Sequence, residues 1–149
     1  MSDLSLKQLS NGCFDLDFDG LDLVLTDTLE NAVIISIGSY ARKKRNAAAN
    51  TEPDIGGWWG DSLDENSIKL GGYIHEAFHE KLEDSTCRDI EKFINDALKW
   101  MISDGVAKNT LCSAEIIDEK TISISIEIVK PAGNPETYIY QFNWEETLA

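Results

Sequence analysis

The sequence predicts a single α+β domain in which two or three helices pack on a mostly antiparallel sheet. Isoleucines alternate with polar residues over 121–130, which is typical of a strand with one buried face. Apolar residues recur at helical spacing over 86–103. Strand patterns lie near both ends of the chain and helical patterns lie between them, which favours segregated helices and strands. A chain of 149 residues has the length of one domain, so we expect residues 1–149 to form one compact domain.

The start of the chain predicts a β-hairpin. Residues 1–12 are expected to be a flexible N-terminal segment. Between residues 14 and 25, leucines and phenylalanines occupy alternate positions on both sides of Gly20, and aspartates separate them before it. This period of two around a glycine predicts a hairpin with one acidic, solvated face.

A helix is predicted after this hairpin. Asp27 and Glu30 fit a capping box, in which two side chains satisfy free backbone N–H groups at the helix start. The β-branched run at 33–35 also fits a strand, but a helical stripe favours a helix. The stripe consists of Leu29, Val33, Ile37 and Tyr40. The basic residues 42–45 suit the last turn of this helix, where positive charge is favourable.

The middle of the chain predicts an irregular segment and two further helices. Proline and clustered glycines stop regular structure over 46–72. A short helix is expected over 74–82, and the longest helix of the chain is expected over 86–103, closed by Gly105. We expect this long helix to pack on the sheet through Ile90, Phe93, Ile94, Leu98 and Met101.

Three strands are predicted to finish the chain. They lie over 110–117, 121–130 and 137–144, with a turn at 118–120 and a loop at 131–135. The last strand places Tyr138, Tyr140, Phe142 and Trp144 on one face. It has no charged residue, proline or lysine inside it, so its edge is expected to be open to pairing with another chain.

The charge of the chain excludes several classes of partner. Acidic residues outnumber basic ones by 27 to 13, which gives a net charge of −14. Nucleic-acid binding needs a basic surface, and anionic membranes repel this field, so neither partner is expected. No stretch is apolar enough to span a bilayer, and the N-terminus lacks a signal-peptide layout. Three widely spaced cysteines predict no disulfide framework, which favours a reduced, cytosolic origin.

One motif suggests catalysis. Residues 75–79, His-Glu-Ala-Phe-His, fit the pattern that binds zinc on a helix, where Glu76 would activate a zinc-bound water. A zinc peptidase also needs a third ligand, and nothing specific marks Glu91 or Asp96 for that role. We therefore expect His75 and His79 to be solvated side chains, and we expect no metal, cofactor or enzyme activity.

Two features indicate a protein partner instead. Arg42 and Arg45 flank the only basic run of the chain, which is a candidate contact for an acidic surface. Trp58 and Trp59 are adjacent in a glycine-rich loop, where regular spacing does not bring both indoles into one core. We expect one tryptophan to pack inward and the other, with Asp54 and Asp61, to face a partner.

The order of these features resembles the baseplate wedge (tail) protein family of Mu-like contractile-tailed phages, known as gene product forty-six. The most specific matching segments are 57–63, Gly-Trp-Trp-Gly-Asp-Ser-Leu, and 98–107, Leu-Lys-Trp-Met-Ile-Ser-Asp-Gly-Val-Ala. The resemblance runs from about residue 14 to residue 144. It is weakest over 73–81, so the zinc-like motif lies where the match to the family is poorest.

The resemblance implies a non-catalytic structural protein of the tail baseplate, present in multiple copies around the tail and assembled in the host cytoplasm. The family is similar to the small wedge protein of T-even phages that starts the tail sheath. Wedge proteins and the sheath protein are then the expected partners, and an arm of the sheath would add as a strand to the open sheet edge. The strand that receives the arm is expected to be either 137–144, which carries Tyr138 and Tyr140, or 121–130. The alternative is that a second copy of the chain, or the N-terminal hairpin, covers this edge.

Two other functions remain as alternatives at this point. One is a small zinc metallopeptidase that uses His75, Glu76 and His79. The other is a free-standing binding module that mimics DNA, which the net charge of −14 suggests. The acidic residues form no long continuous runs, which weakens the second alternative.

Overall fold

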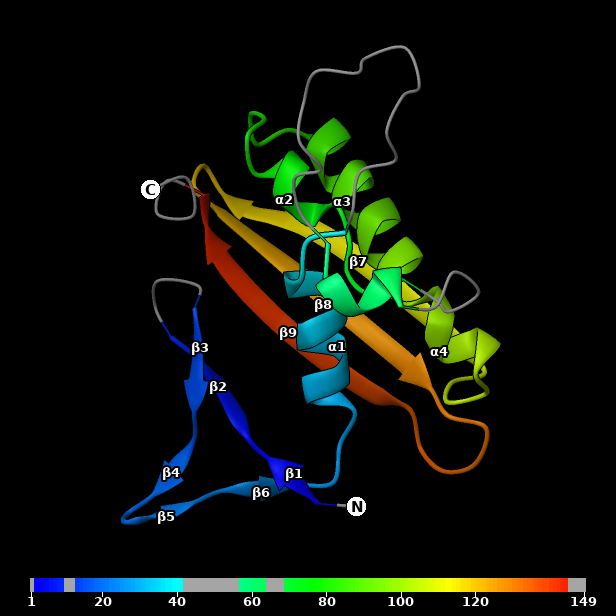
Figure 1. The fold of residues 1–149 in the computed structure, drawn as a ribbon. Helices are drawn as coiled ribbons and strands as arrows, with labels where there is room; N and C mark the ends of the chain where they lie inside the picture. Colours follow the sequence, from blue (N-terminus) through cyan, green and yellow to red (C-terminus); the bar gives the residue numbers. More distant parts are fainter. Residues whose placement is uncertain (1, 10–12, 42–56, 64–68, 145–149) are drawn as a thin grey trace.

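The computed structural model describes residues 2–9, 13–41, 57–63 and 69–144, in which helices pack on an antiparallel sheet, as the α+β prediction requires (Figure 1). The main sheet is antiparallel, with strand order β7-β8-β9. Its strands are β7 (Asn109–Asp118), β8 (Thr121–Val129) and β9 (Glu136–Asn143). All three lie where the alternating patterns predict them.

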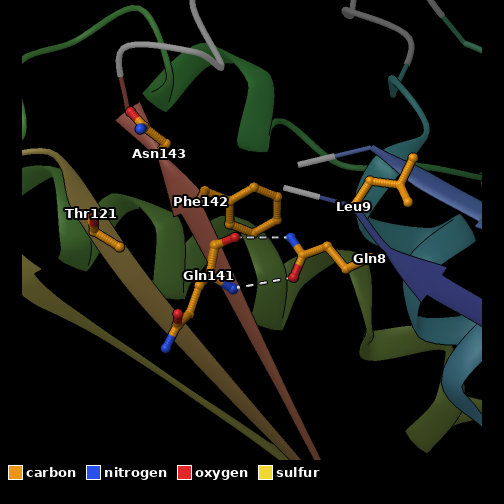
Figure 2. A pocket seen from close by; sticks show the side chains of 6 residues that line it. All are labelled: Gln8, Leu9, Thr121, Gln141, Phe142 and Asn143. Atoms are coloured by element: carbon orange, nitrogen blue, oxygen red, sulfur yellow. Dashed lines mark hydrogen bonds between the residues drawn. The ribbon is translucent and has the colours of Figure 1, made fainter. Parts of the chain in front are cut away.

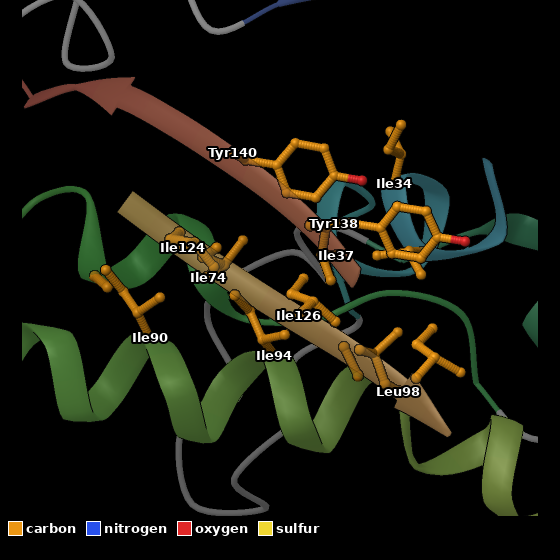
Figure 3. Packing of buried hydrophobic residues seen from close by; sticks show 14 of the residues in the cluster. Ile34, Ile37, Ile74, Ile90, Ile94, Leu98, Ile124, Ile126, Tyr138 and Tyr140 are labelled. Carbon is orange, nitrogen blue, oxygen red and sulfur yellow. The ribbon is translucent and has the colours of Figure 1, made fainter. Parts of the chain in front are cut away.

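The core lies between this sheet and the helices. Ile122, Ile124, Ile126 and Ile128 of β8 are fully buried, and Figure 3 shows Ile90 and Ile94 pointing toward this strand. The alternating residues on the other face of the sheet are half-buried or exposed, and they include Leu111, Ile117 and Ile139. Among the described residues, the helices therefore cover one face of the sheet and leave the opposite face open.

The long predicted helix is divided into two. The helix α3 (Asp84–Ala97) ends at Leu98, and α4 (Lys99–Ser103) follows it. Leu98 has φ −94° and ψ −1°, which departs from helical geometry, although its amide still donates to the carbonyl of Ile94. Its side chain is fully buried, whereas Phe93 is only half-buried. The prediction of one continuous helix was wrong because apolar spacing does not report an interruption at a single residue.

The predicted helix after the hairpin is α1 (Glu30–Gly38), which buries Val33, Ile34 and Ile37. Asp27 and Glu30 do not form the predicted capping box, and no side chain caps this helix at the predicted position. The helix ends at Gly38, so the basic residues 42–45 are not its last turn and lie outside the described residues. Tyr40 is exposed rather than part of the buried stripe.

The sheet stabilises the start of α1 instead. The backbone N–H of Leu29 donates to the Glu136 carboxylate at 3.1 Å and to the Tyr138 hydroxyl at 3.0 Å. Tyr138 also donates to Glu136, and Lys130 forms an ion pair with Glu136. Burial alone would raise the pKa of Glu136, but hydrogen bonds from Lys130, Tyr138 and Leu29 outweigh burial and lower it. Strand β9 therefore caps α1 across more than a hundred residues of sequence.

Tyr138→Phe is expected to lower the free energy of unfolding by about 1–2 kcal/mol, because it removes the hydroxyl from this capping network. Tyr140→Phe is the matched control. The Tyr140 hydroxyl is buried with no hydrogen-bond partner among the described residues, so its loss should change stability by less than about 0.5 kcal/mol. Urea denaturation followed by circular dichroism measures both values. If Tyr140→Phe lowered the free energy of unfolding as much as Tyr138→Phe or more, the Tyr138 hydroxyl would not stabilise the start of α1 as we infer.

The N-terminal region differs most from its prediction. Residues 3–8, expected to belong to a flexible segment, contain β1 (Asp3–Leu4) and β2 (Leu6–Gln8). The predicted hairpin is paired only at its tip. The other strands are β3 (Phe14–Leu16), β4 (Phe18–Asp19), β5 (Asp22–Leu23) and β6 (Leu25–Thr26), in the pairs β1–β6, β2–β3 and β4–β5.

These three short pairs meet at a triangular junction. Ser5 donates its backbone N–H to the carbonyl of Val24 at 2.7 Å, Val24 donates to Asp17 at 3.0 Å, and Asp17 donates to Ser5 at 2.9 Å. The three arms therefore extend in different directions from one ring of backbone hydrogen bonds (Figure 1). We call residues 3–8 and 14–26 the N-terminal ribbon.

Candidate partner-binding site

The outer edge of β9 is the first candidate site, because β9 is the last strand of the main sheet. The Gln8 side-chain amide donates to the backbone carbonyl of Gln141 at 2.9 Å, and its oxygen accepts the Gln141 N–H at 3.3 Å. Figure 2 shows both hydrogen bonds. The backbone of Gln141 therefore points away from β8. Since neighbouring residues of a strand alternate, the backbone groups of Thr137 and Ile139 point the same way.

This edge borders a shallow, open pocket (Figure 2). Its lining residues come from the end of β2 and the residue after it, the start of β8 and the end of β9: Gln8, Leu9, Thr121, Gln141, Phe142 and Asn143. Gln8 makes with Gln141 the two hydrogen bonds that a neighbouring strand would make. Among the described residues, Gln8 is the side chain that hydrogen-bonds the outward backbone of β9, so an incoming strand would displace it at Gln141 and extend the pairing along Ile139 and Thr137.

The opposite edge of the sheet is partly covered by a helix. The backbone N–H of Ala114 in β7 donates to the Glu91 carboxylate of α3 at 2.9 Å. Helix α3 also packs along β7, so an incoming strand has less access there than at β9. Of the two edges, β9 is the better candidate for strand addition.

Tyr138 and Tyr140 were predicted to face a partner at this edge. The aromatic face of β9 is as predicted, but it packs under the helices, and both rings are buried (Figure 3). We therefore assign both tyrosines to the core of the isolated chain. The side chain that β9 offers to a partner is Ile139, which is 63% exposed.

The tryptophan loop is the second candidate site. A short 3₁₀ helix, η1 (Trp59–Ser62), begins directly after Trp58. Hydrogen bonds between the backbones of residues 39–41 and those of Gly57 and Gly72 fix the ends of the loop: Gly57 donates to Tyr40, Gly72 to Ser39 and Ala41 to Gly72. The loop therefore has an anchored base, although it carries little regular structure.

Both tryptophans are exposed, Trp58 by 50% and Trp59 by 69%, with ring centroids 5.5 Å apart. The prediction that one of them packs inward was wrong. The indole of Trp58 lies over Gly60, where a Cβ would approach the ring within 2.2 Å, so a larger residue there would displace the indole. Neither ring reaches the core because the fixed base of the loop holds this segment at the surface.

Asp61 does not face solvent as predicted. It is buried and accepts the backbone N–H of Leu70 at 3.2 Å, while its own carbonyl accepts a hydrogen bond from Lys69. Asp61 therefore holds the loop together. The other predicted contact residues, Arg42, Arg45 and Asp54, lie outside the described residues.

The zinc-like motif does not form the expected helix. Helix α2 (Ile74–Ala77) spans four residues and ends before His79. The His75 ring lies 4.3 Å from the Tyr40 ring, measured between centroids, and His79 is exposed. Within the described ranges, no three His, Cys, Asp or Glu side chains gather closely enough to hold a metal ion. No helix in those ranges is long and apolar enough to cross a bilayer.

Comparison with known proteins identifies the family. A family model described as Phage protein GP46 matches residues 29–135. The chain belongs to the phage protein GP46 family. This confirms the resemblance inferred from the sequence. The GP46 match begins just before α1 and ends before β9, so it covers the helices, the tryptophan loop and two strands of the main sheet.

Two GP46 relatives match nearly the whole chain. The Mu-like prophage FluMu protein gp46 of Haemophilus influenzae is 31% identical over 144 residues, which cover 97% of this chain and 98% of the relative. The baseplate protein gp46 of Escherichia phage Mu is 27% identical over 145 residues, which cover 95% and 96%. These alignments extend into the N-terminal ribbon and β9, which the family model leaves out.

The structure explains the second GP46 segment that the sequence singled out. Trp100 of α4 donates its indole N–H to the hydroxyl of Ser36 in α1 at 2.9 Å. Gly105 takes φ +72° and allows the chain to turn after α4. Sequence reasoning missed Gln8 and Glu91, because a side chain that covers a sheet edge leaves no periodic signal.

Proposed function

We propose that this chain is a structural component of a phage or prophage contractile-tail baseplate, with no catalytic role. Its similarity to the Mu baseplate protein over nearly its full length is the observation that carries this proposal. The open edge of β9 and the two exposed tryptophans support a role in contacts with other proteins. We further propose that wedge neighbours and the sheath protein are the partners, with several copies arranged around the tail.

The finer part of the proposal concerns the sheath. An extended arm of the first sheath ring would add to the outer edge of β9, where Thr137 and Ile139 present backbone groups. Glu127, which lies opposite Thr137 in the sheet, would favour a basic arm, whereas the charge of Glu136 is already paired with Lys130. Pairing of this kind nucleates a regular sheath because each arm fixes the orientation of the subunit that supplies it.

Ile139→Pro is expected to block sheath attachment and leave the isolated chain folded. Proline removes the N–H that points away from β8, so the pairing between β8 and β9 loses no hydrogen bond. Ile139→Val is the matched control, since it keeps the backbone donor and a β-branched side chain. Electron microscopy of tails assembled by each variant measures sheath attachment, and circular dichroism measures folding. Normal sheaths on Ile139→Pro tails would contradict strand addition at this edge.

Trp59→Ala is expected to reduce incorporation of the chain into baseplates while changing the free energy of unfolding by less than about 1 kcal/mol. Trp58→Ala should also fold, with a somewhat larger loss because its ring packs on Gly60. Ile102→Ala, at an exposed position on α4, is the control. Quantifying the chain in purified tails gives the readout. Normal incorporation of both tryptophan variants would show that the loop is not an interface.

A further inference from the structure

The N-terminal ribbon has one apolar face. Residues directly opposite each other in an antiparallel pair point to the same side of it. Three such pairs are Leu4 with Leu25, Leu6 with Leu16, and Phe18 with Leu23. Along each strand these residues are two apart, across Ser5, Asp17 and Val24 of the junction, so the three pairs continue one face.

Two arms of the ribbon are attached to the rest of the domain. On the β2–β3 arm, Phe14 packs edge-on against Tyr140 with ring centroids 5.6 Å apart, and Gln8 bonds the backbone of Gln141. On the β1–β6 arm, the Asn31 side chain of α1 donates to the carbonyl of Leu4 at 2.7 Å and to Asp3 at 2.8 Å.

The β4–β5 arm projects from the domain (Figure 1). Within the described residues, no hydrogen bond, ion pair or aromatic contact joins its residues 18–23 to the helices or the main sheet. Its apolar side chains are correspondingly open: Phe18 is 58% exposed and Leu21, at the tip, is fully exposed. An isolated two-stranded arm of this length is only marginally stable in water. Sheets normally bury their apolar face against a second layer of structure, and this arm has no such layer among the described residues.

The charge of the arm indicates what could cover it. Asp19 and Asp22 oppose each other directly across β4–β5, an arrangement in which two like charges repel. Residues 2–27 contain six aspartates and one lysine, Lys7, so the whole region is strongly acidic. A cationic neighbour would relieve this repulsion, and an apolar neighbour would cover the opposite face.

We propose that the β4–β5 arm is a docking element for a basic protein whose binding surface has an apolar patch bordered by lysine or arginine. Phe18, Leu21 and Leu23 would contact the patch. The long bordering lysine or arginine side chains would reach around the edges of the two-stranded arm to Asp19 and Asp22 on its other face. A second copy of this chain fits poorly, because it would bring the same acidic arm and another net charge of −14. This surface is separate from the β9 edge and the tryptophan loop, and the proposal goes beyond the baseplate role and does not depend on it.

The test uses the full chain and a synthetic peptide of alternating leucine and lysine as the probe. Isothermal titration calorimetry should detect binding that weakens as salt rises, and a leucine–glutamate peptide of equal length should bind at least about tenfold more weakly. Leu21→Ser should weaken lysine-peptide binding about tenfold without affecting folding, since Leu21 makes no buried contact. Ile35→Ser, at a half-exposed position on α1, should not weaken it.

The Ile139→Pro variant distinguishes docking at the β4–β5 arm from the proposed addition of a sheath strand at the β9 edge. That variant should bind the peptide normally, whereas loss of binding would show that the peptide pairs with β9 and would overturn the assignment to the arm. Equal binding of both peptides, or an unchanged affinity in Leu21→Ser, would also overturn it. Analytical ultracentrifugation and flotation with phosphatidylcholine vesicles complete the test. A dimer or vesicle binding that Leu21→Ser abolishes would replace the basic protein with a second copy or a membrane.

Discussion

Leu98→Ala is expected to lower the free energy of unfolding by about 3–5 kcal/mol, because it truncates one of the fully buried side chains of the core. Leu98 is fully buried at the residue that separates α3 from α4, in the same core cluster as the isoleucines of β8. Truncation would leave a cavity where two helices and the sheet meet, and the short α4 offers little freedom to close it. A domain of this size has only about 5–15 kcal/mol of stability, so much of it would be lost.

Phe93→Ala is the control. The sequence predicts that both Phe93 and Leu98 pack in the core, whereas in the structure only Leu98 is fully buried. Phe93 is half-buried and lies near the Tyr73 ring, with centroids 6.3 Å apart. Its truncation should cost roughly 1–2 kcal/mol, below the range for a fully buried phenylalanine. Urea denaturation of both variants gives the comparison. A larger loss of stability for Phe93→Ala than for Leu98→Ala would show that the Phe93 side of α3 contributes more to the core than its half-buried position indicates.

Gly71→Ala is expected to destabilise the domain by about 2–4 kcal/mol and to disturb the base of the tryptophan loop. Gly71 has φ +101°, which side chains rarely adopt. A Cβ there would lie 2.6 Å from the carbonyl oxygen of Ser39 and 2.8 Å from the amide nitrogen of Ala41. Both atoms belong to the backbone that fixes the loop, so neither can move without breaking the hydrogen bonds around Gly72.

Gly133→Ala separates the strain of the backbone from the collision. Gly133 has a similar φ of +106°, but a Cβ there meets nothing within 4 Å. Its substitution should therefore cost only the conformational strain, about 1–2 kcal/mol. Thermal unfolding of the two variants measures the difference, and tryptophan fluorescence reports the loop. Equal losses would show that the close approach at Gly71 contributes nothing.

The parts of the fold that sequence predicted share one physical property. The isoleucines of β8 alternate because helices cover one face of a strand long enough to show the period. Gly105 ends α4 because a left-handed residue was needed there, and glycine supplies it. Both are local signals. The strand pattern repeats over several residues, and the helix end depends on a single glycine.

The parts that sequence missed depend on partners far along the chain. The strands of the N-terminal ribbon are two or three residues long, too short for a periodic pattern, and their pairing follows from the junction of Ser5, Asp17 and Val24. The start of α1 is capped from β9 rather than by Asp27, which no local pattern reports. Trp58 and Trp59 remain at the surface because the backbone of residues 39–41 fixes the loop base.

The triangular junction has a consequence for the order in which the chain folds during synthesis. Its three residues lie within a span of twenty, so the ring of hydrogen bonds can close soon after residue 24 leaves the ribosome. The supports from Tyr140 and Gln141 are among the last residues to be made. Through most of translation, Leu6 and Phe14, which later pack against the core, therefore lack their cover, and the aspartates near them reduce the risk that nascent chains aggregate there.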